Sequence, residues 1–177
     1  YPTGRHHSVA PPEVLDLVGF DHLLIKKTGD SEYPTLQKKH TAAAIDFSGM
    51  GAGYAVDQIG ETLVSLGSTG HLVELGGEVR AWGQPSLVKE WRVALRTTET
   101  KPPDIIVLHH GQAVAVARSV KGKRIVDPTT GEIVKLSSSA QAVVAYAATC
   151  AEADALATAH VLDGIRKETQ ASSSMIQ

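Results

Sequence analysis

The segment that most constrains the fold is "AIDFSGMGAGYAVDQIGETLVSLG", residues 44–67. It opens within an apolar run typical of a strand, which we expect over 42–47. It then passes through a glycine-rich stretch and continues with apolar residues three and four positions apart, a spacing typical of an amphipathic helix. Gly67 is well placed to end that helix. The segment therefore predicts a strand, a tight crossover and a helix.

Gly49, Gly51 and Gly53 alternate at the crossover. Glycines at this spacing let backbone N–H groups come close to a neighbour, and the start of a helix favours anions. The pattern is neither G-x-G-x-x-G nor a P-loop, which requires Gly-Lys-Ser/Thr. A close crossover of the chain and a phosphate cradle both stay open on this evidence.

The rest of the chain predicts several strands and a second helix. A short helical turn is expected over 13–18 and a polar loop from 28 to about 39. Apolar patterns predict strands at 22–27, 71–83 (interrupted by two glycines), 90–97, 104–110, 112–119 and 141–149, with two extended pieces around the turn in 124–134. The Gly111 turn favours a hairpin between 104–110 and 112–119.

A capping box, Thr149 followed three residues later by Glu152, predicts a helix over 150–168. Because strands follow one another without a strict βαβ repeat, we expect an α+β fold with a mixed, largely antiparallel sheet and packed helices. We divide the chain into a loose arm (1–12), a single domain (13–167) and a C-terminal tail (168–177).

Composition narrows the classes of function. A hydrophobic content of 42% and a formal charge of −2 give no basic field, which argues against nucleic acid as the partner. No stretch resembles a membrane span or a signal peptide. The single cysteine, Cys150, rules out an internal disulfide and reads as a buried or helix-start thiol. Because the chain begins at Tyr1 rather than Met, we expect a processed or truncated piece of a longer protein.

Asp154 and Thr158 lie four positions apart in "ADALATA", so that a carboxylate and a hydroxyl share one helix face. Together with a backbone carbonyl they suit Mg²⁺, which takes few protein ligands. A carboxylate among alanines needs a partner, and the alternative is a hydrogen-bonded structural pair.

Two further positions have both a structural and a functional interpretation. Gly76 and Gly77, before Glu78, indicate either a bulge or a close approach by a backbone or a ligand. Asp127, before Pro128, is expected to hold its own turn through an Asx hydrogen bond.

The order of these motifs resembles the ApbE family, the FAD:protein FMN transferases once called thiamine biosynthesis lipoproteins. The chain has "IDFSGMGAGYAVD", "ELGGEVRAWG", "RIVDPTTG" and "ADALATA". The family pattern has "GGIAKGYAVD" after an Asp-led strand, then "NLGGD", "HIIDPRTG" and "ADALST". The resemblance covers roughly residues 15–164 and implies an ApbE-like, T-fold-like core without the N-terminal part of the family fold.

That resemblance implies an enzyme, a Mg²⁺-dependent flavin transferase. It would bind FAD and transfer FMN to a Thr or Ser of a target flavoprotein, or hydrolyse FAD to FMN and AMP. The resemblance implies a Mg²⁺ ion held by Asp154, Thr158 and the Gly51 carbonyl, and catalytic roles for Asp154 and Arg124. The cofactor-binding residues that it implies are Gly49, Gly51, Gly53, Gly76, Gly77, Glu78, Ser119 and Asp127.

The chain departs from the family at two charged positions. The family's Lys in the glycine loop is Ala52 here, and the His before "IIDP" is Arg124, which can pair with a phosphate but cannot act as a base. A non-catalytic relative that binds flavin or a partner, or a purely structural subunit, is therefore an alternative interpretation. The implied partners are FAD and a target flavoprotein. For the missing N-terminal half three interpretations stay open: this chain is a fragment, a second chain supplies that half as a partner, or the site is incomplete. Only the family suggests a location, which is extracytoplasmic.

Overall fold

The computed structural model describes residues 11–27, 29, 33–86, 90–97, 102–118, 125–134 and 142–174, with side chains up to residue 163 in the last range. The chain divides into two compact units. Unit 1 comprises Tyr1–Asp46 and Arg124–Lys135, and unit 2 comprises Phe47–Lys123 and Leu136–Gln177.

Unit 1 consists of short elements. It has a helical turn, α1 (Pro12–Leu15), a 3-10 turn, η1 (Phe20–His22), and two antiparallel hairpins, β1 (Leu23–Lys26) with β2 (Thr35–Lys38) and β8 (Ile125–Val126) with β9 (Ile133–Val134). The first strand and the two extended pieces around the Pro-Thr-Thr-Gly turn confirm the sequence prediction. β2 lies where the sequence predicted a polar loop, because pairing with β1 orders residues that have no apolar face of their own.

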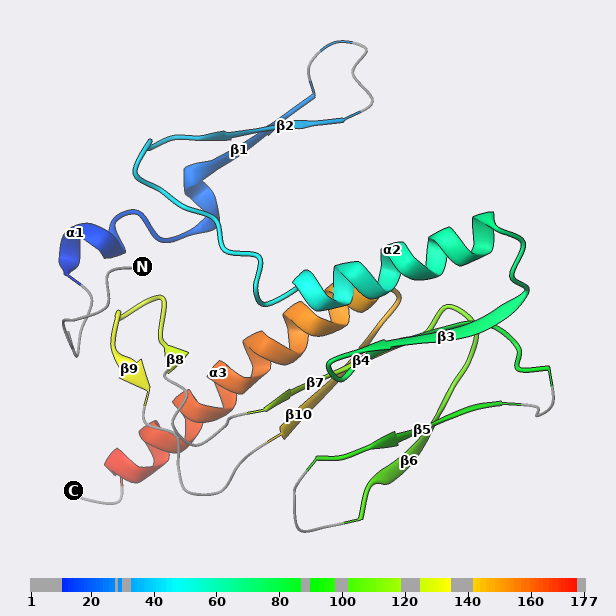
Figure 1. Ribbon diagram of the computed structural model, residues 1–177. Coiled ribbons are helices and arrows are strands. Elements are labelled where there is room, and N and C mark those ends of the chain that lie inside the picture. Colours follow the sequence, from blue (N-terminus) through cyan, green and yellow to red (C-terminus); the bar gives the residue numbers. More distant parts are fainter. Residues whose placement is uncertain are drawn as a thin grey trace. The chain divides into compact units, whose positions relative to one another are not determined.

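The sheet of unit 2 has four strands in the order β10-β7-β4-β3. They are β3 (Gly70–Leu75), β4 (Glu78–Gly83), β7 (Ala113–Arg118) and β10 (Ala142–Ala147). Each pairing is antiparallel, with Val144 opposite Val116 and Val79 opposite Val114. The α+β class with a largely antiparallel sheet is thus confirmed, and no parallel pair occurs among the described strands (Figure 1).

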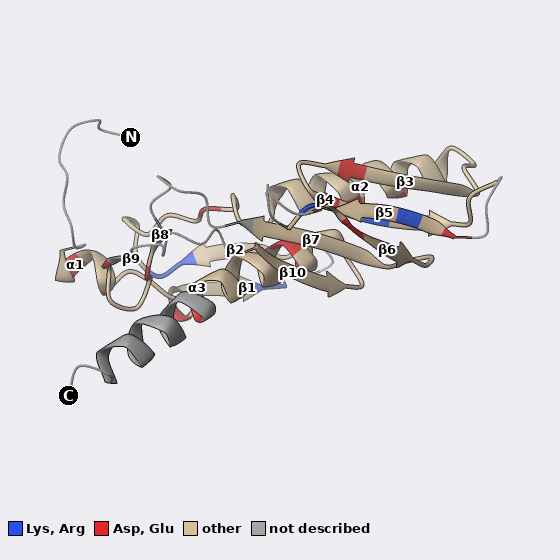
Figure 2. Cartoon of the chain, turned by 90° about the horizontal axis from the view of Figure 1, so that it is seen from below, with Lys and Arg blue, Asp and Glu red and all other residues tan. Residues whose placement is uncertain are grey.

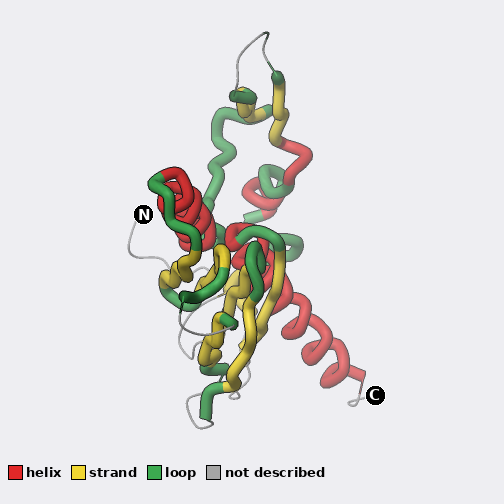
Figure 3. The backbone as a smooth tube through the Cα atoms, turned by 90° about the vertical axis from the view of Figure 1, so that its right-hand side faces the viewer, coloured by secondary structure: helices red, strands yellow, loops and turns green. Residues whose placement is uncertain are grey.

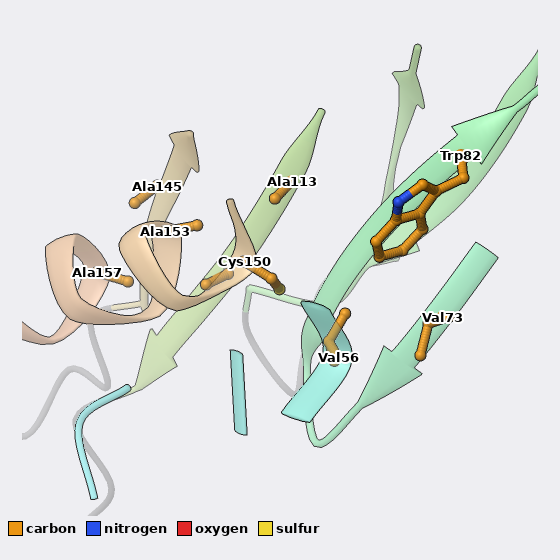
Figure 4. Packing of buried hydrophobic residues seen from close by; sticks show 9 residues of the cluster. Val56, Val73, Trp82, Ala113, Ala145, Cys150, Ala153 and Ala157 are labelled. Carbon is orange, nitrogen blue, oxygen red and sulfur yellow. The ribbon is translucent and has the colours of Figure 1, made fainter. Parts of the chain in front are cut away.

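Two helices pack on one face of this sheet, α2 (Gly51–Ser65) on β3 and β4 and α3 (Cys150–Ser174) on β7 and β10. Figure 3 shows these helices and strands as separate layers. Between them lies a core of small and medium side chains around one indole, drawn in Figure 4. Its buried members are Val56, Val73, Trp82, Ala113, Ala115, Ala145, Cys150, Ala153 and Ala157.

The second face of the sheet carries the hairpin of β5 (Trp91–Leu95) and β6 (Asp104–Leu108). Because side chains alternate along a strand, Ala113 and Ala115 face the helices while Val114 packs with Leu95 and Leu108 of this hairpin.

The end of α2 follows the prediction. The amides of Gly67 and Ser68 donate to the carbonyls of Val64 and Leu63 over 2.9 and 3.0 Å, and Gly67 has a φ of 89°. This is a Schellman arrangement, which requires a positive φ at the residue after the cap. At the start of α3 the Thr149 hydroxyl accepts from the Glu152 amide over 3.2 Å, which confirms the predicted cap. α3 runs on to Ser174, into the segment predicted as a tail.

Three predictions about strands were wrong. Residues 42–47 form no strand: they pair with none of the strands that the structure describes, and of the six only Ala43 is buried. Gly76 and Gly77 do interrupt the strand predicted over 71–83, but as the two-residue turn of the β3–β4 hairpin and not as a bulge, with φ of 73° and 119° and Leu75 opposite Glu78.

The third error concerns β6, which pairs with β5 and not with β7. The Gly111 amide donates to the Ala81 carbonyl over 2.8 Å, and the Gln112 carbonyl accepts from the Ala81 amide over 3.1 Å. The chain therefore leaves the β5–β6 hairpin at this turn and joins the four-stranded sheet beside β4.

Candidate functional site

Two buried carboxylates join α2 and α3 where both helices begin. The Gly53 amide in the first turn of α2 donates to Asp154 Oδ2 over 3.1 Å. In the opposite direction, the amides of Cys150 and Ala151 at the start of α3 donate to the carboxylate of Asp57 on α2, over 2.9 and 3.0 Å. Each helix therefore supplies the acceptor for amides that the other helix leaves unpaired at its N-terminus.

Gly53 allows the two helices to approach this closely. A Cβ at this position would lie 2.3 Å from the Cys150 carbonyl oxygen and 2.8 Å from the Ala151 Cα. Both neighbours are backbone, which cannot rotate away as a side chain can. Of the two interpretations of the glycine stretch, a close crossover accounts for Gly53.

The other two glycines of the stretch have different surroundings. A Cβ at Gly49 would lie 3.4 Å from Cγ2 and 3.8 Å from Oγ1 of Thr158, so this exposed threonine stands beside the loop. Gly51 has open space where a Cβ would be, and its φ is not positive. Neither packing nor backbone conformation therefore requires glycine at position 51.

Asp57 is tied in turn to the sheet. One guanidinium nitrogen of Arg80, on β4, lies 2.7 Å from Asp57 Oδ1 and 3.8 Å from a carboxylate oxygen of Glu61. The guanidinium carbon lies 4.8 Å from the centre of the Trp82 ring. Sequence reasoning gave no role to Asp57 or Arg80. The available signal was an Asp four residues after Gly53, on the apolar face of α2.

Glu78, at the start of β4, is half-buried. Its burial, followed by the nearby Asp154 carboxylate, raises the pKa of the Glu78 carboxyl. Burial, followed by the carboxylate of Asp57, also raises the pKa of the Cys150 thiol, to about 12. Cys150 is thus the buried, helix-start thiol that the sequence predicted, and a thiolate nucleophile is not available there at neutral pH.

The β3–β4 turn lies at the Glu78 end of this region. The Gly77 amide donates to Glu74 Oε1 over 3.1 Å, and a Cβ at Gly76 would lie 3.2 Å from Glu78 Oε2. The geometry of the turn explains both glycines without a ligand.

The remaining predicted site residues lie elsewhere. Asp127 belongs to unit 1, where its Oδ1 accepts from the amide and the hydroxyl of Thr129 over 2.8 and 2.7 Å. This confirms the predicted Asx turn. Ser119 and Arg124 lie outside the described residues.

The family resemblance implies a Mg²⁺ ion in this region, and such an ion requires a set of oxygen ligands. No three His, Cys, Asp or Glu side chains come together to hold a metal ion among the residues the structure describes. A cation would therefore depend on a mixed set of one carboxylate, one hydroxyl and one carbonyl. Asp154 is only 8% exposed, and its Oδ2 accepts a hydrogen bond from the Gly53 amide. The oxygen chemistry of Asp154, Thr158 and the Gly51 carbonyl fits a hard cation.

Other surfaces of the described chain are less distinctive. A groove of about 420 Å³ lies between the start of β7 and the end of β10. It is lined by His110, Gln112 and Tyr146, among others, and contains none of the predicted site residues. Lys and Arg residues lie on separate elements in Figure 2. In the described ranges no helix has the length and apolarity that crossing a membrane requires.

Comparison with known proteins gives a consistent result. The model of the ApbE family matches residues 5–175. The FAD:protein FMN transferase of Haemophilus influenzae is 28% identical over 153 residues, which are 80% of this chain and 43% of that protein. The enzyme of the same name from Chlamydia trachomatis is 33% identical over 142 residues, covering 73% of this chain and 42% of that protein.

Solved structures agree with the fold. The flavinyl transferase ApbE of Pseudomonas stutzeri, in its apo form, superposes with a TM-score of 0.66 at 30% identity, covering 90% of this chain and 50% of that one. The ApbE protein of Thermotoga maritima gives a TM-score of 0.65 at 28% identity, covering 83% and 48%. The chain thus spans about half the length of the relatives it matches.

Proposed function

Since the chain belongs to the ApbE family, we propose that it forms the part of an FAD:protein FMN transferase that binds the pyrophosphate of FAD together with Mg²⁺. The transferase activity is in the names of its relatives. This chain corresponds to about half their length, so the complete reaction would also involve polypeptide equivalent to the other half.

One observation carries the proposal. The Gly53 amide in the glycine loop is bonded to Asp154, 101 residues further along the chain, and Thr158 stands beside Gly49. Two motifs that are distant in sequence thus form one small region, and both contain residues that the family resemblance assigns to the site.

The start of α2 favours an anion. The amides of Gly51 and Ala52 are the first two of the helix, and among the described residues neither has an acceptor. Such amides bind phosphate oxygens well. The next amide of the helix is already bonded to the carboxylate of Asp154, which would repel a phosphate brought to the same place. A cation between the phosphate and the carboxylate would remove this repulsion.

That cation would be held by Asp154, Thr158 and the Gly51 carbonyl, and when bound it would neutralise charge on the pyrophosphate. The chain's own residues perform the rest of the binding. The amides at the start of α2 orient the phosphates, and the small glycines admit them close to the backbone. A phosphate contact of Arg124 is implied by the family resemblance alone. Flavin contacts of Ser119, Gly76, Gly77, Glu78 and Asp127 are implied by the family resemblance alone, and the proposal does not rest on them.

The products distinguish this function from flavin binding alone. FAD is incubated with Mg²⁺ and the protein, with and without a Thr- or Ser-bearing acceptor flavoprotein, and AMP is measured by chromatography. We expect AMP release that depends on Mg²⁺ and is lost in Asp154→Ala. Glu152→Ala, which removes an exposed carboxylate from the same helix, is the matched control and should release AMP at the wild-type rate. Absence of AMP and of bound flavin in the wild type would refute the proposal.

A second candidate function rests on Ala52 and Arg124. The glycine loop lacks the positive charge of the family's Lys, and the position of its His has no proton acceptor. A relative that binds flavin without cleaving it would show these changes. It would bind FAD with an affinity that Asp154→Ala leaves unchanged, and it would release no AMP.

A further inference from the structure

A chain of buried polar contacts runs from the sheet to the proposed cation ligand. It begins at Arg80 on β4, passes to Asp57 on α2, then to the first amides of α3, and reaches Asp154 in the next turn of that helix. Asp154 then returns to α2 through the Gly53 amide. Gly53 and Asp57 lie four residues apart, so both face α3 from one side of α2.

Both oxygens of the Asp57 carboxylate accept hydrogen bonds in this arrangement. The residue is 7% exposed, and its two oxygens accept three hydrogen bonds, from Arg80, Cys150 and Ala151, at 2.7 to 3.0 Å. A buried carboxylate with a guanidinium and two helix amides is held in one orientation. It therefore fixes where α3 begins relative to α2, and with it the direction of the side chains in the first turns of α3.

We propose that Asp57, oriented by Arg80, is a positioning residue that sets the Asp154 carboxylate toward the start of α2. This proposal rests on the proposed function only in taking Asp154 to be a cation ligand. The contact that it predicts to be sensitive runs from the Gly53 amide to Asp154 Oδ2, and it can be followed experimentally in metal-free protein. Asp57 itself would touch neither cation nor flavin.

The proposal is tested by removing the negative charge of Asp57. Asp57→Asn keeps the size of the side chain and one acceptor oxygen, but it forms no ion pair with Arg80, and its NH2 group cannot accept from an α3 amide as the second carboxylate oxygen does. Glu61→Gln is the matched control, because it removes the same charge from the same helix at an exposed residue, whose Oε1 lies 3.8 Å from Arg80 and accepts from the Trp82 indole over 3.3 Å. Arg80→Lys is a second variant, for the case that Asp57→Asn does not fold.

The first readout is amide hydrogen exchange in the metal-free protein. We expect the Gly53 amide to exchange about tenfold faster in Asp57→Asn, and in Arg80→Lys to a smaller degree, relative to the amides of β10 in the same sample. Glu61→Gln should exchange as the wild type does. If only the Cys150 and Ala151 amides lose protection, or if all amides change equally, Asp57 acts only as a local cap and the proposal is wrong.

The second readout uses Mn²⁺ as a spectroscopic probe of the cation site, titrated by electron paramagnetic resonance. We expect the dissociation constant for Mn²⁺ to rise about tenfold in Asp57→Asn and to stay within about twofold in Glu61→Gln. If Mn²⁺ binds equally well to Asp57→Asn, positioning of Asp154 is refuted. If the wild type binds no Mn²⁺, the proposed function fails, while hydrogen exchange at Gly53 still decides the role of Asp57.

Discussion

Replacing Gly53 by Ala tests whether the glycine stretch serves helix packing. The new Cβ would lie 2.3 Å from the Cys150 carbonyl oxygen, well inside the 3.0 Å below which such contacts essentially never occur. The two helices would have to separate, which costs about 1–3 kcal/mol as overpacking. Separation would also weaken the bond from the Gly53 amide to Asp154, worth about 1.5–3 kcal/mol because the acceptor is charged. A gain in helix propensity of about 1 kcal/mol offsets part of this.

We therefore expect Gly53→Ala to lower the free energy of unfolding by about 2–4 kcal/mol. The assay is urea unfolding followed by the fluorescence of the two tryptophans. Gly51→Ala is the control, because no atom lies within 4 Å of its added Cβ, and we expect a change within about 1 kcal/mol of zero. Equal stability of the two variants would show that α2 and α3 do not approach through Gly53.

Three further predictions concern the surroundings of the site. Gly60→Ala places a Cβ 2.1 Å from the Trp82 ring and should cost about 1–3 kcal/mol in urea unfolding, whereas a neutral effect would contradict the packing. Because the folded-state pKa of Glu78 is raised, wild-type stability falls relative to Glu78→Gln as the pH rises from about 4.5 through that pKa. A stability difference that is constant with pH would refute this. Cys150 should react with iodoacetamide at about pH 8 only after unfolding, since its thiol is buried and its pKa is about 12, and rapid labelling of the folded protein would disprove this.

Local signals in the sequence were sufficient for the end of α2 and the start of α3. The Schellman end at Gly67 and the Thr149 cap each depend on hydrogen bonds within a few residues, so the sequence contains the whole interaction. Strand pairing depends on partners far along the chain. Residues 42–47 have the composition of a strand but pair with none of the strands in the described ranges, and β6 joins β5 while Gly111 and Gln112 bind Ala81 on β4.

The candidate site was predictable only in part, because some of its residues lie in recognisable sequence motifs and others depend on contacts far along the chain. Family motifs brought attention to Gly53, Asp154 and Thr158, and the structure places these residues together. The role of Asp57 was not predictable, because its three hydrogen-bond donors lie 23, 93 and 94 residues away along the chain. A single carboxylate on an apolar helix face indicates that a partner is needed but not which one.

We propose that the glycine loop and Asp154 together bind the pyrophosphate of FAD through a cation. The most direct test of this proposal is FAD affinity, measured from flavin fluorescence in Mg²⁺ and in EDTA, for the wild type and Asp154→Ala. We predict that Mg²⁺ strengthens binding at least tenfold in the wild type and has no effect in Asp154→Ala, a difference of about 1.4 kcal/mol or more. FAD binding that is indifferent to Mg²⁺ in the wild type, or equally Mg²⁺-dependent in the variant, would contradict the account.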